Sequence, residues 1–172
     1  MPSGRLSDDD EVDLLIDGWS SILPGVDLTP LDILSRLRRV ARRLDEVRRR
    51  SFARAGLTIW EFDVLAVMRR YGRARDLSPA DLIALTRSTS GTMTNRIDRL
   101  TERGLIRRRP NPEDGRSVLL TLTDAGAERV DLAMTELAQR EAELIRFLSP
   151  ADAAAMVRLL RTLSESLRGD RS

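Results

Sequence analysis

The spacing of apolar residues along the chain predicts a mainly α-helical protein. Ser7 and the four acidic residues after it favour a helix start. This helix runs to about Ile22, where Leu23-Pro24-Gly25 ends it. Pro30 then begins a longer helix, in which apolar residues recur at helical spacing and arginines occupy another face. We expect it to end near Ala55-Gly56.

The middle of the chain predicts three shorter helices and a β-hairpin. The helices are expected at 57–71, 78–85 and 88–103, and each begins at or next to a hydroxyl residue that can cap its first turn. Two β-type runs within 105–122 flank a turn of Pro, Asn, Asp and Gly residues. Three helices followed by a hairpin predict a winged helix-turn-helix at about 57–122.

Two long helices are predicted after the hairpin. Thr123-Asp124 and Ser149-Pro150 each favour a helix start, and apolar residues continue at helical spacing to about Leu167. These helices are too long and too one-sidedly apolar for a small core to cover, so we expect pairing with a second copy. The expected organisation is an N-terminal extension with an added helix at 1–29 and a domain at 30–172, with dimerisation helices at about 30–55 and 123–168.

Composition narrows the function classes. A chain of 172 residues can bury one core without disulfides or metals. The absence of Cys and His excludes thiol redox chemistry, Cys/His zinc sites and histidine acid–base catalysis. The sequence indicates no cofactor. No apolar run approaches the ~18 residues of a membrane span, and the N-terminus is acidic where a secretory signal is basic, so we expect a cytoplasmic protein.

The net charge of +2 conceals an uneven distribution. Residues 1–28 hold seven acidic residues and one arginine, so the remainder is clearly basic. All 29 basic residues are arginine. Genome-wide nucleotide bias explains such a preference, and an arginine surface also suits contacts to phosphates and to a narrow minor groove. Composition leaves both explanations open.

The predicted 88–103 helix combines hydroxyl, amide and guanidinium side chains. Those expected to face DNA are Ser88, Ser90, Thr92, Asn95, Arg96 and Arg99. Ordinary helix capping also explains hydroxyls at a helix start. Gly91 favours the DNA interpretation, because glycine in a helix costs ~1 kcal/mol relative to alanine and is tolerated where another surface comes close.

The hairpin that follows is basic and carries a stiff turn. Pro110 and Pro112 restrict the turn, and Asp114 is placed to direct the guanidinium of Arg116. Arg109 adds a further cation. A solvated loop is the alternative, but a basic hairpin directly after a recognition helix suits double-stranded DNA. The helix can enter a major groove while the hairpin reaches the neighbouring minor groove.

Several blocks of the sequence resemble the MarR family of transcriptional regulators. They are Gly56-Leu57-Thr58, Glu61 to Leu65, Leu77-Ser78-Pro79, Met93 to Leu100, Gly104-Leu105, Asp114-Gly115-Arg116 and Leu122-Thr123. The resemblance covers roughly residues 30–168. It implies a homodimer joined through its terminal helices, with one recognition helix and one wing arginine from each half on a pseudo-palindromic operator.

The acidic helix before residue 30 resembles a narrower, urate-responsive branch of that family (HucR- and PecS-like). This resemblance implies a ligand pocket formed by Trp19, Asp63, Arg70 and Arg96. It also implies that urate or a related purine, bound in this pocket, releases the protein from DNA. The residues themselves are compatible with a planar ligand: Asp63 lies in an apolar run, and Arg70 follows on the same helical face. The alternative is structural, with Trp19 packing the extra helix and Asp63 paired with an arginine. A carboxylic or aromatic acid is another possible effector.

Other function classes would leave different features in the sequence or in binding. The sequence has no nucleophile–base set, glycine-rich phosphate loop or metal-spaced carboxylate cluster, so we do not expect an enzyme. An architectural DNA-binding protein would respond to no ligand and show weak sequence preference. A protein-interaction adaptor built on a winged helix would show little loss of affinity with salt.

Overall fold

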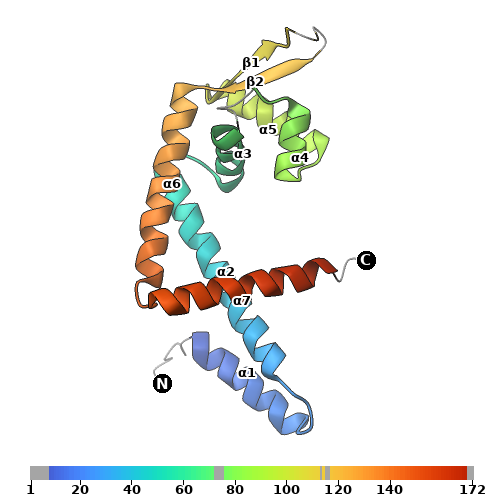
Figure 1. Ribbon diagram of the computed structural model, residues 1–172, viewed down its shortest axis with the longest axis vertical. Coiled ribbons are helices and arrows are strands. Elements are labelled where there is room, and N and C mark those ends of the chain that lie inside the picture. Colours follow the sequence, from blue (N-terminus) through green and yellow to red (C-terminus); the bar gives the residue numbers. More distant parts are fainter. Residues whose placement is uncertain (1–7, 72–75, 113, 115–116, 170–172) are drawn as a thin grey trace, which may run out of the picture.

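The computed structural model describes residues 8–71, 76–112, 114 and 117–169 (Figure 1). Within these residues the chain is mainly helical, with one two-stranded antiparallel sheet, as predicted. The elements in chain order are α1 (Asp8–Ile22), α2 (Thr29–Arg54), α3 (Ile59–Tyr71), α4 (Pro79–Thr86), α5 (Ser90–Glu102), β1 (Ile106–Pro110), β2 (Val118–Leu122), α6 (Asp124–Ile145) and α7 (Pro150–Gly169).

The two N-terminal helices form a helical hairpin at one end of the molecule (Figure 1). Val12 of α1 is fully buried, and two ion pairs join the helices: Arg36 with Asp13 at 2.5 Å and Arg39 with Glu11 at 2.7 Å. The predicted helix before residue 30 is therefore confirmed. It packs on the first half of α2 only, while the second half of α2 lies against α3 and α6.

Local hydrogen bonds explain where the helices of the winged unit begin. Ser78 and Asp81 cap α4 reciprocally, each side chain accepting the other residue's backbone N–H. The N–H of Thr92 donates to the Thr89 side chain, so Thr89 caps the helix and α5 begins at Ser90, two residues after the predicted start. Ser88 consequently lies in the connection rather than in the helix. Gly104, with φ of +67°, ends this segment as glycine readily does.

The wing is a short antiparallel hairpin. Ile106 pairs with Leu122 and Pro110 with Val118, while Leu77 forms an isolated bridge to Leu120 at the hairpin's edge. The predicted hairpin is thereby confirmed. The predicted contact between Asp114 and Arg116 cannot be followed, because Arg116 lies outside the described residues.

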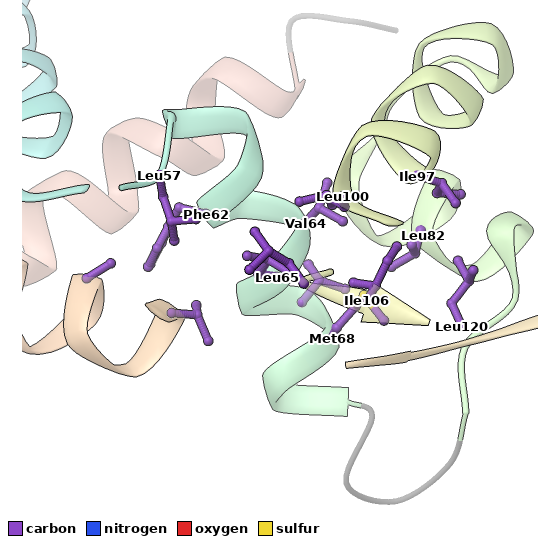
Figure 2. Close-up of a cluster of buried hydrophobic side chains, with 14 of the residues drawn as sticks. Leu57, Phe62, Val64, Leu65, Met68, Leu82, Ile97, Leu100, Ile106 and Leu120 are labelled. Carbon is purple, nitrogen blue, oxygen red and sulfur yellow. The ribbon is translucent and has the colours of Figure 1, made fainter. Parts of the chain in front are cut away.

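The core lies beneath α5, between α3, α4 and the wing, and extends to α2 and α6 (Figure 2). Phe52 of α2 stacks on Phe62 of α3 with the ring centroids 3.9 Å apart. This aromatic pair joins the winged unit to the long helices. Among the helices of the described residues, none combines the length and apolar character that a membrane span requires.

The last two helices extend away from this core. Thr123 caps α6 by accepting the N–H of Gly126, as its sequence predicts. Beyond Leu137 the apolar side chains of α6, of the connection after it and of α7 are largely exposed: Phe147 in the connection is 77% exposed and Leu159 in α7 is 71% exposed. In Figure 1, α7 crosses the molecule far from the winged unit. A single chain therefore leaves much of its C-terminal apolar surface uncovered.

Candidate nucleic-acid interface and ligand pocket

One side of α5 is packed into the core and the other faces solvent. Met93, Ile97 and Leu100 are at most 3% exposed. Thr92, Asn95 and Arg99, three predicted DNA contacts, lie away from this core side and are exposed, and the predicted contact Ser90 is exposed at the first residue of the helix. This division leaves a polar helix face that can enter a groove without disturbing the core.

The arginines around α5 fall into two groups. Three are paired with carboxylates: Arg103 with Glu61, Arg108 with Asp98, and Arg109 with Asp76. Three others have no carboxylate partner among the described residues: Arg96, Arg99 and Arg107. The second group keeps its charge available for an anionic partner. The predicted contact Arg109 lies near the turn end of β1, paired with Leu119 across the hairpin, and its charge is balanced by Asp76.

Glu61 joins the start of α3 to the end of α5. Its carboxylate accepts bonds from the backbone N–H and the hydroxyl of Thr58, both at 2.8 Å, and pairs with Arg103. Burial by itself raises the pKa of Glu61, but these donors outweigh burial and hold the pKa below its ordinary value of 4.5. A depressed pKa stabilises the fold above about pH 4.5, and this stabilisation is lost as pH falls through the folded-state value.

A hollow of about 510 Å³ lies between α2, α3, the end of α4 and α6. The predicted ligand residues Asp63 and Arg70 both line it. Asp63 forms a long ion pair with Arg48 at 3.5 Å, as expected if Asp63 has a structural role. Its side chain is nevertheless 49% exposed, so the carboxylate can still be reached from the hollow. Arg70 bonds to the carbonyl of Ala66 at 3.2 Å and has no carboxylate partner among the described residues.

The hollow also contains a second, balanced charge pair. Arg69 of α3 donates to both carboxylate oxygens of Asp131 on α6, at 2.8 and 2.6 Å. This pairing raises the pKa of Arg69, so its guanidinium stays charged. With both pairs balanced, Arg70 leaves the hollow with a net positive charge suited to an anion.

Trp19 and Arg96, the other predicted ligand residues, lie elsewhere in the single chain. Trp19 is near the end of α1, so in the hairpin it lies beside the start of α2, beyond the Arg36–Asp13 pair. Arg48 is twelve residues further along α2 than Arg36, which is ~18 Å of helix. Arg96 lines a separate hollow of about 400 Å³ on α5. One chain thus brings together Asp63 and Arg70 but not Trp19 or Arg96.

Comparisons with known proteins agree with this architecture. The MarR family model matches residues 55–117, from the end of α2 to the wing. The transcriptional repressor NicR of Pseudomonas putida is 30% identical over 146 residues, covering 82% of this chain and 90% of NicR. The chain belongs to the MarR family. It is therefore a DNA-binding transcriptional regulator, in a family of regulators and not of enzymes.

Two further relatives place this MarR-family protein more closely. The regulator PecS of Dickeya dadantii is 29% identical over 161 residues, covering 94% of this chain and 97% of PecS. A match of this extent includes part of α1, so the added helix lies within the shared length. The structure of an Escherichia coli MarR mutant complexed with operator DNA has a TM-score of 0.62 and 27% identity, covering 84% of this chain and 96% of that one.

A second solved structure concerns a ligand-controlled relative. That structure addresses the regulation of DNA binding of Bordetella bronchiseptica BpsR by 6-hydroxynicotinic acid. BpsR is 30% identical to this MarR-family protein with a TM-score of 0.61, covering 77% of this chain and 98% of BpsR. The match therefore includes nearly the whole of a relative whose DNA binding responds to a small acid.

Sequence reasoning overlooked two residues that shape these sites. Arg48 lies within an arginine-rich stretch of α2, and nothing in that pattern distinguishes it from its neighbours. Trp60 follows the start of α3 and contacts Arg96 of α5. A bulky aromatic in the first turn of a helix, where polar residues are usual, is a signal that could have indicated a contact with another element.

Proposed function

We propose that this MarR-family protein binds a pseudo-palindromic operator as a homodimer, with α5 of each subunit in a major groove. The observation that carries this proposal is the solvent-facing side of α5, where Asn95 and Arg99 are exposed and Arg99 has no carboxylate partner among the described residues. Arg116 is assigned to the minor groove, supported by its position in the sequence between the two strands of the wing. Half-sites about one helical turn apart would fit the two-fold symmetry of such a dimer.

The uncovered apolar surface supports the homodimer. Exposed apolar side chains follow α1, α2, the end of α6 and α7, including Ile33, Val40, Leu144, Leu159 and Leu160. Contiguous apolar surface of this kind normally lies in an interface. A second copy would bury it through a two-fold symmetric contact in which the same helices of both chains meet.

Gly91→Ala is expected to weaken operator binding while leaving the fold as stable or more so. Within 4 Å of an added Cβ there is nothing in the single chain, so the methyl group meets only what approaches from outside. Replacing a helical glycine stabilises by up to ~1 kcal/mol. We expect affinity for a duplex selected from a random pool to fall severalfold and urea unfolding to shift upward or stay unchanged.

The same duplex tests the class of partner. Wild-type affinity should fall by ~10³-fold or more between about 50 and 200 mM salt if several phosphates are contacted. Flat salt dependence would support the adaptor interpretation and contradict DNA binding through α5. Full affinity of Gly91→Ala would show that DNA does not approach the first turn of α5.

We also propose that a small planar anion controls DNA binding by occupying the hollow at Asp63 and Arg70. Urate or a related purine is the preferred effector, and a carboxylic or aromatic acid is the second candidate. Asp63 would accept N–H groups of a purine, and the unpaired Arg70 would bind its charge. The extensive similarity to PecS and the acid response stated for BpsR support this assignment.

Trp19 would close the pocket from the partner subunit. The distance along α2 prevents Trp19 from reaching Asp63 of its own chain, whereas a dimer formed through α1 and α2 would bring a second α1 close. Arg96 would couple ligand and operator if it turns from the DNA face toward the pocket. Ligand and DNA would then weaken each other's binding by the same factor.

Titrating the protein–duplex complex with urate, xanthine, hypoxanthine, 6-hydroxynicotinic acid and simple carboxylic acids tests the effector. We expect one planar anion to release DNA, and Arg70→Gln to raise the concentration required about tenfold, because a charged hydrogen bond is lost. Trp19→Phe and Arg96→Ala should raise it as well. Arg50→Gln is the control, because Arg50 bonds to Glu46 at 2.8 Å on the same long helix that supplies Arg48.

Release that is unchanged in Arg70→Gln, Trp19→Phe and Arg96→Ala would reject this pocket. If no compound releases the duplex, the effector proposal fails while DNA binding stands. A protein that also binds unselected duplexes equally well would be an architectural DNA-binding protein.

A further inference from the structure

Trp60 lies at the junction between α3 and the DNA-facing side of α5. It is half-buried, packs against the core, and lines two neighbouring surface hollows. One hollow contains Thr92, Asn95 and Arg96, and the other extends from Gly56 to Arg103. Arg99 borders both hollows as well. The indole of Trp60 thus forms part of the protein surface that we propose to contact DNA.

The guanidinium of Arg96 lies over the Trp60 ring. Its central carbon is 5.6 Å from the ring centroid, within the range of a cation–π contact. On its other side, Arg96 Nη1 donates to the Ser88 hydroxyl at 3.5 Å. These two contacts restrict a side chain that otherwise has four rotatable bonds. Arg96 is accordingly half-buried at the border between the buried and exposed sides of α5, where it lines a surface hollow together with Thr92, Asn95 and Arg99.

An aromatic ring orients an arginine without neutralising it. Arg103, Arg108 and Arg109 around the same helix are held by carboxylates, whose negative charge cancels much of their attraction for phosphate. Arg96 has no carboxylate partner among the described residues, so its full charge remains while its direction is set. Because the side chain is already restricted in the free protein, it loses less conformational entropy when it binds DNA.

We propose that Trp60 is a positioning residue for operator binding, which holds Arg96 on the DNA-facing side of α5 with its charge intact. This inference rests on the proposed function, because it requires α5 to be the recognition helix. It adds a residue outside α5 and the wing to the determinants of DNA affinity. In the ligand-free protein, the contacts with Trp60 and Ser88 then define the position of the Arg96 side chain.

A double-mutant cycle tests the inference. Affinity for a duplex selected by the wild-type protein from a random pool is measured for Trp60→Leu, Arg96→Ala and the double variant. We expect Arg96→Ala to weaken binding about fivefold or more, as for a lost phosphate or base contact. Trp60→Leu should weaken it about two- to fivefold, the size of a partly exposed cation–π contact. The double variant should bind no more weakly than Arg96→Ala alone.

Matched variants separate positioning from a structural role. Trp60→Phe retains an aromatic face and should recover most of the affinity that Trp60→Leu loses, even if the leucine variant unfolds more readily in urea. Tyr71→Leu removes an equivalent contact at the other end of α3, where Arg70 lies 5.7 Å from the ring centroid. It should show no coupling to Arg96→Ala.

Four outcomes would overturn the inference, and they differ in which other proposal fails with it. Additive effects of Trp60→Leu and Arg96→Ala would reject positioning while Arg96 stays a DNA contact. Trp60→Phe binding as weakly as Trp60→Leu would do the same. An Arg96→Ala variant with full affinity would remove the DNA contact of Arg96 itself. A wild-type protein that shows no salt-dependent binding to any duplex would instead contradict the proposed function.

Discussion

Gly126→Ala is expected to destabilise the fold by about 3 kcal/mol, through a clash between α6 and the start of the wing. A Cβ added at Gly126 would lie 2.1 Å from the carbonyl oxygen of Leu105 and 2.8 Å from Cδ1 of Leu122. The Leu105 oxygen cannot move freely, because it accepts hydrogen bonds from the backbone N–H of Thr123 at 3.1 Å and from its hydroxyl at 3.0 Å. Urea unfolding followed by circular dichroism measures the effect.

Gly18→Ala is the matched control for this clash. Gly18 lies inside α1, and an added Cβ would meet nothing within 4 Å. Its replacement should leave the unfolding midpoint unchanged or raise the free energy of unfolding by up to ~1 kcal/mol. A Gly126→Ala variant as stable as the wild type would show that α6 does not approach the wing this closely.

Leu159→Glu is expected to convert the proposed dimer into monomers and to reduce operator affinity by about 100-fold or more. In the single chain Leu159 is 71% exposed, so a carboxylate there costs the monomer little. In a dimer the carboxylate would be buried against apolar side chains without a partner. A monomer also loses the gain in affinity that comes from two linked half-sites. Light scattering at micromolar concentration and binding to the selected duplex measure the two effects.

Arg158→Glu places the same charge on the polar side of α7 and should leave both measurements close to those of the wild type. A wild-type protein that is monomeric at micromolar concentration would contradict the dimer directly. A dimeric Leu159→Glu variant would show that α7 lies outside the interface.

Local interactions explain how much of the fold could be predicted. Hydrogen bonds within four residues fix the starts of α4 and α6, at Ser78 and Thr123, and both were predicted from residue type alone. The two-residue shift at the start of α5 has the same origin, because neighbouring hydroxyls compete to cap the helix and Thr89 accepts the N–H of Thr92. The exposed side of α5 followed from helical periodicity.

The sequence by itself determined the order of the elements, the polar face of α5 and the MarR resemblance, since each depends on residues close together in the chain. Only the tertiary structure decided which arginines remain without a carboxylate partner, since Arg109 meets Asp76 and Arg103 meets Glu61 across long separations. It also separated Trp19 from Asp63, two residues that resemblance alone had grouped. The physical reason is that ion pairs and pockets form between elements, and their positions depend on how the whole core packs.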